Sequence, residues 1–192
     1  GIKILMKNLV EVKNLKKNYG SKNAVKGISF NIKENEILGL LGPNGCGKTT
    51  TIGMMLGLLK PTNGEIIIDG KKIEESRIEI LKKINFISPY IELPKKLTVE
   101  QNLIVYGKLY NVENLKKRIE YLIEKLRLSD LLHRVTGELS SGQKNRISLA
   151  KALINDPIVL FLDEPTASLD PEIGDYVRTF LEDYKKEKKI SI

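Results

Sequence analysis

Cysteine, long apolar runs and internal repeats are scarce or absent in this sequence of 192 residues. The single cysteine, Cys46, excludes a disulfide bond within the chain and fits a reducing compartment such as the cytoplasm. No apolar run approaches the roughly 18 residues that span a bilayer, and residues 1–6 are too short for a signal peptide. We therefore expect any membrane role to come through a partner. The absence of repeats, low-complexity tracts and long linkers favours a single domain.

Acidic residues are outnumbered by basic ones, which gives a formal net charge of +8. Such a charge suggests nucleic-acid binding as one possible function. However, the lysines are scattered and acidic residues accompany them in most segments, and only residues 185–189 are densely basic. Solvated faces explain this distribution better than a stripe that follows phosphates. With 41% hydrophobic and 29% charged residues, the composition is ordinary for a globular domain.

The most informative stretch is a glycine-rich segment that follows an apolar run. Residues 37–41 predict a buried strand. Residues 42–49, Gly-Pro-Asn-Gly-Cys-Gly-Lys-Thr, fit the P-loop pattern G-x-x-x-x-G-K-[ST]. A helix is expected over residues 50–59, with Lys60-Pro61 as the point where it stops.

This pattern predicts a site for a nucleoside triphosphate. The glycines allow successive backbone amides to point at phosphates, and the helix adds its positive N-terminal end. Lys48 reaches the β- and γ-phosphates, and the Thr49 hydroxyl ligates Mg²⁺. The predicted nucleotide-binding residues are Gly42, Pro43, Asn44, Gly45, Cys46, Gly47, Lys48, Thr49 and Thr50.

Short strands and helices are expected on both sides of the P-loop. Two alternating runs, residues 8–14 and 25–33, predict strands that pair with each other. Apolar runs and turn residues predict the other elements. These are strands at 65–69, 84–87 and 158–162 and helices at 76–83 and 171–186, while residues 189–192 resemble the start of another strand.

Between the strands at 84–87 and 158–162 the sequence predicts mainly helices. Thr98 and Gln101 form a capping-box pattern that opens a helix toward Tyr110. Apolar residues at helical spacing predict a second helix over 113–127, and a short one is expected over 129–133. We interpret residues from about 90 to 137 as an inserted α-helical subdomain.

Two acidic residues, Asp163 and Glu164, follow the predicted strand at 158–162. A P-loop requires a Mg²⁺ partner at the tip of a neighbouring strand, and Asp163 is placed to hold the metal through water. Glu164 is placed to polarise a water for in-line attack on the γ-phosphate, which makes it the candidate catalytic residue.

Leu139-Ser-Ser-Gly-Gln143 precedes a predicted helix and is, by itself, consistent with an ordinary serine-capped helix start. In this chain it resembles the LSGGQ signature of ATP-binding cassette (ABC) ATPases. Asp163-Glu164 and Ala167-Ser-Leu-Asp170 then resemble that family's Walker B motif and D-loop. The resemblance covers essentially the whole chain, with the motifs in the family's order.

The resemblance implies roles for residues that spacing alone does not assign. Tyr19 is expected to stack on adenine. Two such ATPase domains are expected to enclose two ATP molecules head to tail, with the D-loop residues Ser168 and Asp170 linking the two sites. The signature residues of one protomer would contact the nucleotide held by the other protomer, and these residues are Ser140, Ser141, Gly142 and Gln143.

Three departures from the family pattern stand out. Ser141 replaces the usual second glycine of the signature, and Pro89 lies where the Q-loop glutamine is usual. The family's switch histidine is expected beyond Ile192, so we expect the 192-residue chain to be a C-terminally truncated domain with weak ATPase activity. The only histidine, His133, lies in the helical insert and is expected to be a surface or helix-packing residue.

The expected fold is α/β: a P-loop NTPase parallel core sheet with an N-terminal antiparallel β subdomain and an inserted α-helical subdomain. The expected function is ATP hydrolysis, with Mg²⁺, by the nucleotide-binding subunit of an ABC transporter. Its expected partners are a second ABC subunit and a transmembrane subunit docked at residues 88–100, on the cytoplasmic face of the membrane. No direct nucleic-acid partner is expected. Two alternatives are a soluble ABC ATPase that acts on nucleic acid or ribosomes and a regulatory ATP-binding module with little turnover.

Overall fold

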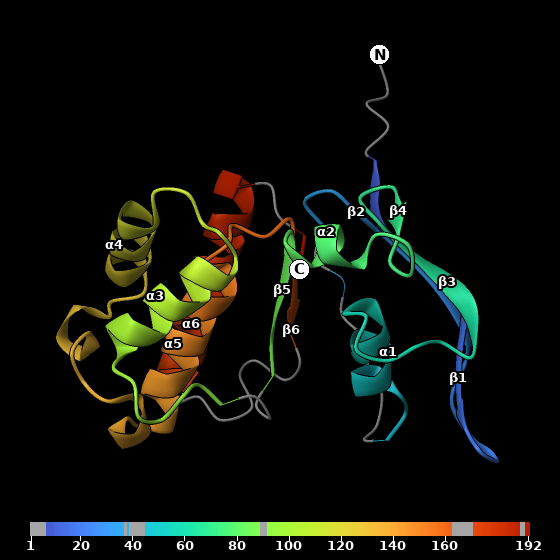
Figure 1. Cartoon of the computed structure of the whole chain (residues 1–192), viewed down its shortest axis with the longest axis horizontal. Coiled ribbons are helices and arrows are strands. Elements are labelled where there is room, and N and C mark those ends of the chain that lie inside the picture. The colour runs from blue at the N-terminus through green and yellow to red at the C-terminus, as the bar shows by residue number, and fades with distance from the viewer. Residues whose placement is uncertain (1–6, 37, 39–44, 89–91, 163–170, 189–190) are drawn as a thin grey trace. The chain divides into compact units, whose positions relative to one another are not determined.

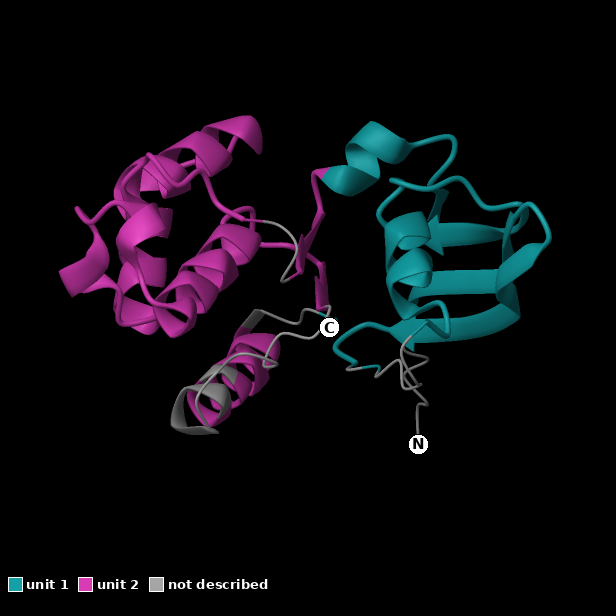
Figure 2. Cartoon of the chain, turned by 90° about the horizontal axis from the view of Figure 1, so that it is seen from below, with its two compact units in different colours: residues 1–81, 189–192 teal, residues 82–188 magenta. Residues whose placement is uncertain are grey.

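The chain folds into two compact units, residues 1–81 with 189–192 and residues 82–188 (Figure 2). The computed structural model describes residues 7–36, 38, 45–88, 92–162, 171–188 and 191–192. Each unit has its own elements and its own buried apolar side chains.

The first unit is built on an antiparallel sheet of four strands (Figure 1). The strands follow the order β2-β1-β3-β4, and each is antiparallel to its neighbours. Their bounds are Asn8–Tyr19 for β1, Lys22–Lys33 for β2, Asn63–Ile68 for β3 and Lys71–Lys72 for β4. The expected antiparallel subdomain is therefore confirmed, although β1 and β2 are longer than the alternating runs predicted. The outer half of β1 is less buried than its inner half, so the apolar alternation fades there.

Helix α1, Lys48–Met55, ends earlier than the sequence predicted. Gly57 adopts a left-handed conformation with φ of 65°. Its amide donates to the Met54 carbonyl at 3.0 Å, and the Leu58 amide donates to the Gly53 carbonyl at 2.9 Å. These two bonds form a Schellman motif, which satisfies carbonyls at the helix end. The prediction that Lys60-Pro61 stops the helix was wrong because Gly57 ends it first.

The last residues of the chain, 191 and 192, belong to the first unit. The Ile192 amide donates to the Glu36 carbonyl, and the Leu38 amide donates to the Ile192 carbonyl, both at 2.9 Å. Ile192 thus bonds to both Glu36 and Leu38, which are separated by one residue. This is the hydrogen-bond pattern of parallel strands. The predicted strand at 37–41 lies outside the described residues except for Leu38, and the predicted strand start near residue 192 agrees with this pairing.

The second unit contains a parallel pair, β5 (Ile84–Ile87) and β6 (Val159–Leu162). Both strands were predicted within one residue of these bounds. The side-chain amide of Asn85 donates to Asn155 Oδ1 at 2.9 Å, and the side-chain amide of Asn155 donates to the Ile84 carbonyl at 3.2 Å. These bonds satisfy the polar side chain of Asn85, which is buried, and an unpaired polar group there would be costly.

The second unit also contains four helices, with short 3₁₀ turns at Ser129–Leu131 and Thr136–Glu138 (Figure 1). They are α3 (Val99–Leu109), α4 (Leu115–Lys125), α5 (Ser141–Leu153) and α6 (Pro171–Lys188), while the short α2 (Arg77–Leu81) belongs to the first unit. The Thr98–Gln101 capping box at the start of α3 is confirmed. None of the helices in the described part of the chain is long and apolar enough to cross a membrane.

A polar cluster connects α4, α6 and the end of α5. Arg118 donates to the Leu153 carbonyl, to Asp156 Oδ1 at 3.3 Å and to the Tyr184 hydroxyl oxygen at 2.5 Å. The Tyr184 hydroxyl donates in turn to Asp156 at 2.6 Å. Tyr184 is almost fully buried, and this burial raises its pKa, so the hydroxyl stays protonated as a donor.

Replacing Tyr184 with phenylalanine tests the cluster. Tyr184→Phe keeps the ring but leaves Asp156 and Arg118 without a shared partner, so the free energy of unfolding should fall by about 1–3 kcal/mol. Denaturant unfolding would measure it. Tyr110→Phe is the control, because the half-buried Tyr110 hydroxyl makes no hydrogen bond within the described residues. Equal stability for both variants would show that the cluster contributes little.

Candidate nucleotide site

The described part of the P-loop borders a hollow of about 480 Å³ in the first unit. One wall comes from the loop and the start of α1, and the other comes from β2. The lining residues are Asn23, Ala24, Val25, Lys26, Ile28, Gly45, Cys46, Gly47, Lys48 and Thr51. This volume lies within the usual range for small-molecule sites. Of the predicted P-loop residues, Gly42, Pro43 and Asn44 lie outside the described part of the chain.

Gly47 occupies a position that no side chain would fit. Its φ is 100°, in the left-handed region, and it is the residue just before α1. A Cβ atom built on it would lie 2.4 Å from the Ala24 carbonyl oxygen. The loop therefore passes within contact distance of β2, and only glycine permits that approach. Gly45 also has a positive φ, 80°, but a Cβ there would meet nothing within 4 Å.

The start of α1 faces the hollow with its backbone amides. The Thr51 amide and hydroxyl both donate to the Gly47 carbonyl at 2.8 Å, which begins the helix. The amides before Thr51 therefore point out of the helix end. The first turn contains no acidic residue, and its N-cap residue, Gly47, has no side chain to cap it. Such a helix end attracts anions. Of the predicted residues on this turn, Thr49 is exposed and Lys48 and Thr50 are partly buried.

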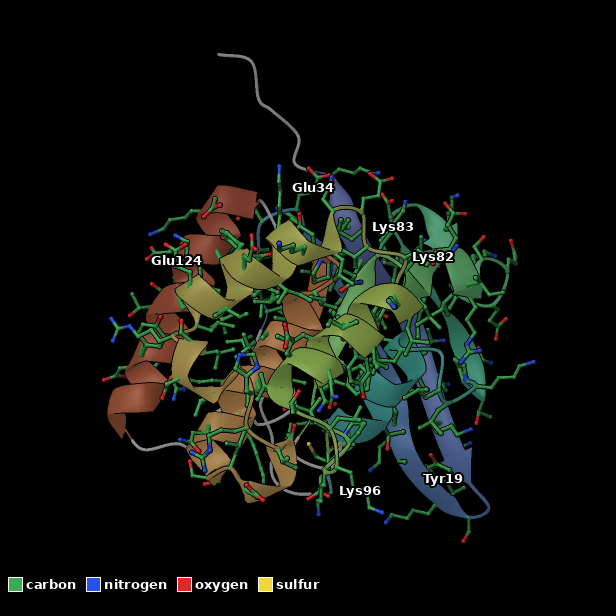
Figure 3. The ribbon with its side chains drawn as sticks, turned by 60° about the vertical axis from the view of Figure 1, so that its left-hand side comes forward. Tyr19, Glu34, Lys82, Lys83, Lys96 and Glu124 are labelled. Carbon is green, nitrogen blue, oxygen red and sulfur yellow. The ribbon has the colours of Figure 1, made fainter. Side chains whose placement is uncertain are left out.

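Tyr19 lies at the tip of the β1–β2 hairpin (Figure 3). Its side chain is 47% exposed, and the Lys17 ammonium lies 5.2 Å from the ring centroid. Tyr19 is not among the lining residues, but it is close to them: it pairs with Lys22, and the adjacent pair includes Asn23, which borders the hollow. An exposed ring near the hollow suits stacking, while its adenine contact stays a prediction.

The second half of the predicted site follows β6 in the other unit. β5 and β6 are parallel and end together, with Ile87 opposite Leu162. Asp163 and Glu164 come directly after Leu162, but they lie outside the described residues, as do the D-loop residues Ser168 and Asp170 and the Q-loop position Pro89. Their assigned roles therefore stay predictions.

The signature segment forms a second capping box at the start of α5. Ser140 Oγ accepts from the Gln143 amide at 3.2 Å, and Gln143 Oε1 accepts from the Ser140 amide at 3.0 Å. Both bonds use side-chain oxygens as acceptors. The hydroxyl hydrogen of Ser140 and the side-chain amide hydrogens of Gln143 are left to donate to another acceptor, such as a phosphate. Ser141 is exposed and Gly142 is partly buried within the first turn.

One buried cation was not identified from the sequence. Lys151 on α5 is 8% exposed, and its ammonium lies 5.0 Å from the Phe86 ring centroid and 5.2 Å from that of Tyr106. Burial lowers its pKa to about 8, while the two rings favour the charged form. The apolar spacing of α5 gives no sign of this arrangement, because it depends on rings from β5 and α3. His133, by contrast, is largely exposed as predicted.

Comparisons with known proteins agree with these motifs. The sequence model of the ABC transporter family matches residues 25–167. The Nod factor export ATP-binding protein I of Burkholderia orbicola (strain AU 1054) is 39% identical over 165 residues, which are 85% of this chain and 54% of that protein. The bacitracin transport ATP-binding protein BcrA of Bacillus licheniformis is 37% identical over 190 residues, 97% of this chain and 61% of that protein.

Solved structures give the same answer. A bacterial ABC transporter cassette solved as a dimer has a TM-score of 0.84 and 28% identity, over 95% of this chain and 85% of that one. The chain spans only 54–61% of the length of the two curated relatives. The family model nevertheless covers well over half of the chain, and it includes the P-loop and the signature. The chain belongs to the ABC transporter family.

Proposed function

We propose that this chain binds and hydrolyses ATP to power transport through a separate membrane subunit. The observation that carries the proposal is the hollow beside Gly47, where a helix N-terminus without an acidic first turn meets a loop that only glycine fits. A triphosphate in the hollow would meet these amides and the Lys48 ammonium together. The family membership supports ATP as the ligand.

Mg²⁺ fits the residues that would hold it. Thr49 is exposed on the first turn of α1, and Asp163 directly follows β6. A hydroxyl and a carboxylate are both hard oxygen donors of the kind that Mg²⁺ prefers. When bound, the ion would neutralise part of the charge on the β- and γ-phosphates.

The catalytic proposal rests on Glu164. Its carboxylate would hold and polarise the attacking water, while Lys48 and the loop amides would orient the γ-phosphate and stabilise the charge that develops on it. Support for this role comes from the position of Glu164, two residues after the end of β6, and from the family's motif.

We also propose that two copies, or one copy and a related subunit, form the complete site. The donors left by the Ser140–Gln143 capping box would bind the γ-phosphate held by the partner's P-loop. A related cassette has been solved as a dimer. The side chains of Ser140 and Gln143 are each already held by one hydrogen bond of the capping box. Little conformational entropy would therefore be lost when they contact the partner's nucleotide.

The proposed membrane-subunit surface is the segment from 88 to 100. Asn102, fully buried on α3, anchors the described part of this segment: its side-chain NH2 group lies within hydrogen-bond distance of the carbonyls of Pro94 (3.2 Å) and Thr98 (3.0 Å) and of Thr136 Oγ1 (2.8 Å). A segment held in this way would keep its conformation when the membrane subunit binds, and would so transmit movement between the two subunits. The names of the relatives, which refer to export and transport, are in line with a membrane partner.

The nucleotide site is tested by Lys48→Ala. The variant loses the one P-loop side chain that would carry a positive charge to the phosphates, so its affinity for Mg-ATP should fall by roughly tenfold or more. Isothermal titration calorimetry would measure it. Lys60→Ala, which removes an exposed lysine of the same unit, serves as the matched control and should bind as the unmodified chain does. Unchanged affinity in Lys48→Ala would refute the P-loop assignment.

The catalytic step is tested by Glu164→Gln, made in a chain extended to full length, because the 192-residue chain is expected to hydrolyse ATP only weakly. The amide keeps the shape of the side chain but is a far weaker base, so binding should persist while hydrolysis slows by at least about a hundredfold. The ATP-bound dimer should then accumulate, as seen by gel filtration with Mg-ATP. Normal turnover together with a purely monomeric profile would remove Glu164 from the catalytic role.

A further inference from the structure

The β1–β2 hairpin carries a concentration of positive charge that the ATPase motifs do not use. Residues 13–33 contain no aspartate or glutamate. The acidic residues that flank this stretch are Glu11 and Glu34, and Glu34 lies at the opposite end of the hairpin from Tyr19 (Figure 3). The stretch contains six lysines, namely Lys13, Lys16, Lys17, Lys22, Lys26 and Lys33.

These lysines differ in their partners. Lys13 pairs with Glu11 at 3.4 Å and with Glu65 at 3.5 Å. Lys17 donates to the Lys60 carbonyl at 2.7 Å. Lys16 and Lys26, in contrast, make no ion pair within the described part of the chain. The outer half of the hairpin therefore presents charge that its own residues do not neutralise.

Lys16 and Lys26 are directly opposite each other across the strand pair. Like charges at directly opposed positions destabilise a sheet. The Lys16 stem lies against β2 at Gly27, where a Cβ would lie 3.0 Å from Lys16 Cε. The fold thus places two lysines at directly opposed positions on the strands beside the P-loop, an arrangement that is expected to cost stability.

Lys26 also lines the hollow that the P-loop borders. The charged residues in that lining are Lys26 and Lys48, and no acidic residue is among those described. Lys48 comes from the loop side and Lys26 from the β2 side. A ligand that is anionic over several ångströms would be attracted by both walls, and its charge would also relieve the repulsion between Lys16 and Lys26.

We propose that Lys26 is a second phosphate-binding residue, which contacts the nucleotide from β2 while Lys48 contacts it from the P-loop. The inference rests on the proposed ATP site and adds to it a second lysine that binds the phosphates. Lys16, opposite Lys26, strengthens the field without lining the hollow.

The experiment titrates Mg-ATP into the 192-residue chain and into Lys26→Gln, Lys26→Arg and Lys33→Gln, at about 50 and 300 mM salt, which screen charge to different extents. Lys33 is an exposed lysine near the base of the same strand, so its variant controls for the loss of one charge. Lys26→Gln should weaken binding about three- to fivefold at low salt, as expected for an exposed charge pair. It should also show a smaller salt dependence. Lys26→Arg should keep the affinity of the unmodified chain, and Lys33→Gln should change the affinity little.

A second readout separates binding from folding. Without nucleotide, Lys26→Gln should melt at the same temperature as the unmodified chain or higher, because a like-charge pair is removed. Its stabilisation by Mg-ATP should be smaller. Equal affinity losses in Lys26→Gln and Lys33→Gln, or unchanged affinity in Lys26→Gln, would overturn the assignment while leaving the P-loop site intact. Absence of Mg-ATP binding by the unmodified chain would refute the proposed function itself, and this inference with it.

Discussion

The close approach of the P-loop to β2 is the constraint on which the nucleotide site depends. Gly47 lies against the Ala24 carbonyl, and any larger residue would force the loop away from the strand. Because α1 begins at the next residue, this contact also fixes where the helix starts and where its amides point. It brings β2 side chains to the rim of the same hollow. The site is therefore a product of the hairpin as much as of the glycine-rich loop.

Two helices in the second unit begin with the same device. A Ser or Thr oxygen and a Gln oxygen accept backbone hydrogen bonds at the starts of α5 and α3. At α3 the box orders the segment that we assign to membrane-subunit contact. At α5 it orders the side chains that we assign to the second nucleotide. In both places the residues that cap the helix also belong to a surface with a proposed contact, so helix stability and the proposed contact depend on the same side chains.

The sequence predicted those features whose causes lie within a few residues of chain. The capping box at Thr98, the strands that became β5 and β6 and the P-loop turn all depend on local patterns. The predicted end of α1 at Lys60-Pro61 was wrong, because Gly57 and its two hydrogen bonds end the helix earlier. The Arg118–Asp156–Tyr184 cluster and the rings around Lys151 could not be predicted, since their members are separated by tens of residues. Asp163 and Glu164 lie outside the described residues, so their roles still rest on motif and family.

The ammonium of Lys151 gives the α5 helix an unusual response to alkaline conditions. Its pKa falls from 10.5 to about 8 on folding, so the unfolded chain binds more protons between these values. The protonated Lys151 therefore lowers the free energy of unfolding. This penalty is complete below about pH 8 and fades as the pH rises toward 10.5. The contribution of Lys151 to the free energy of unfolding should therefore become less unfavourable as the pH rises from about 8 to 10.5. This response is opposite to that of a lysine held in an ion pair, whose contribution is lost as it deprotonates.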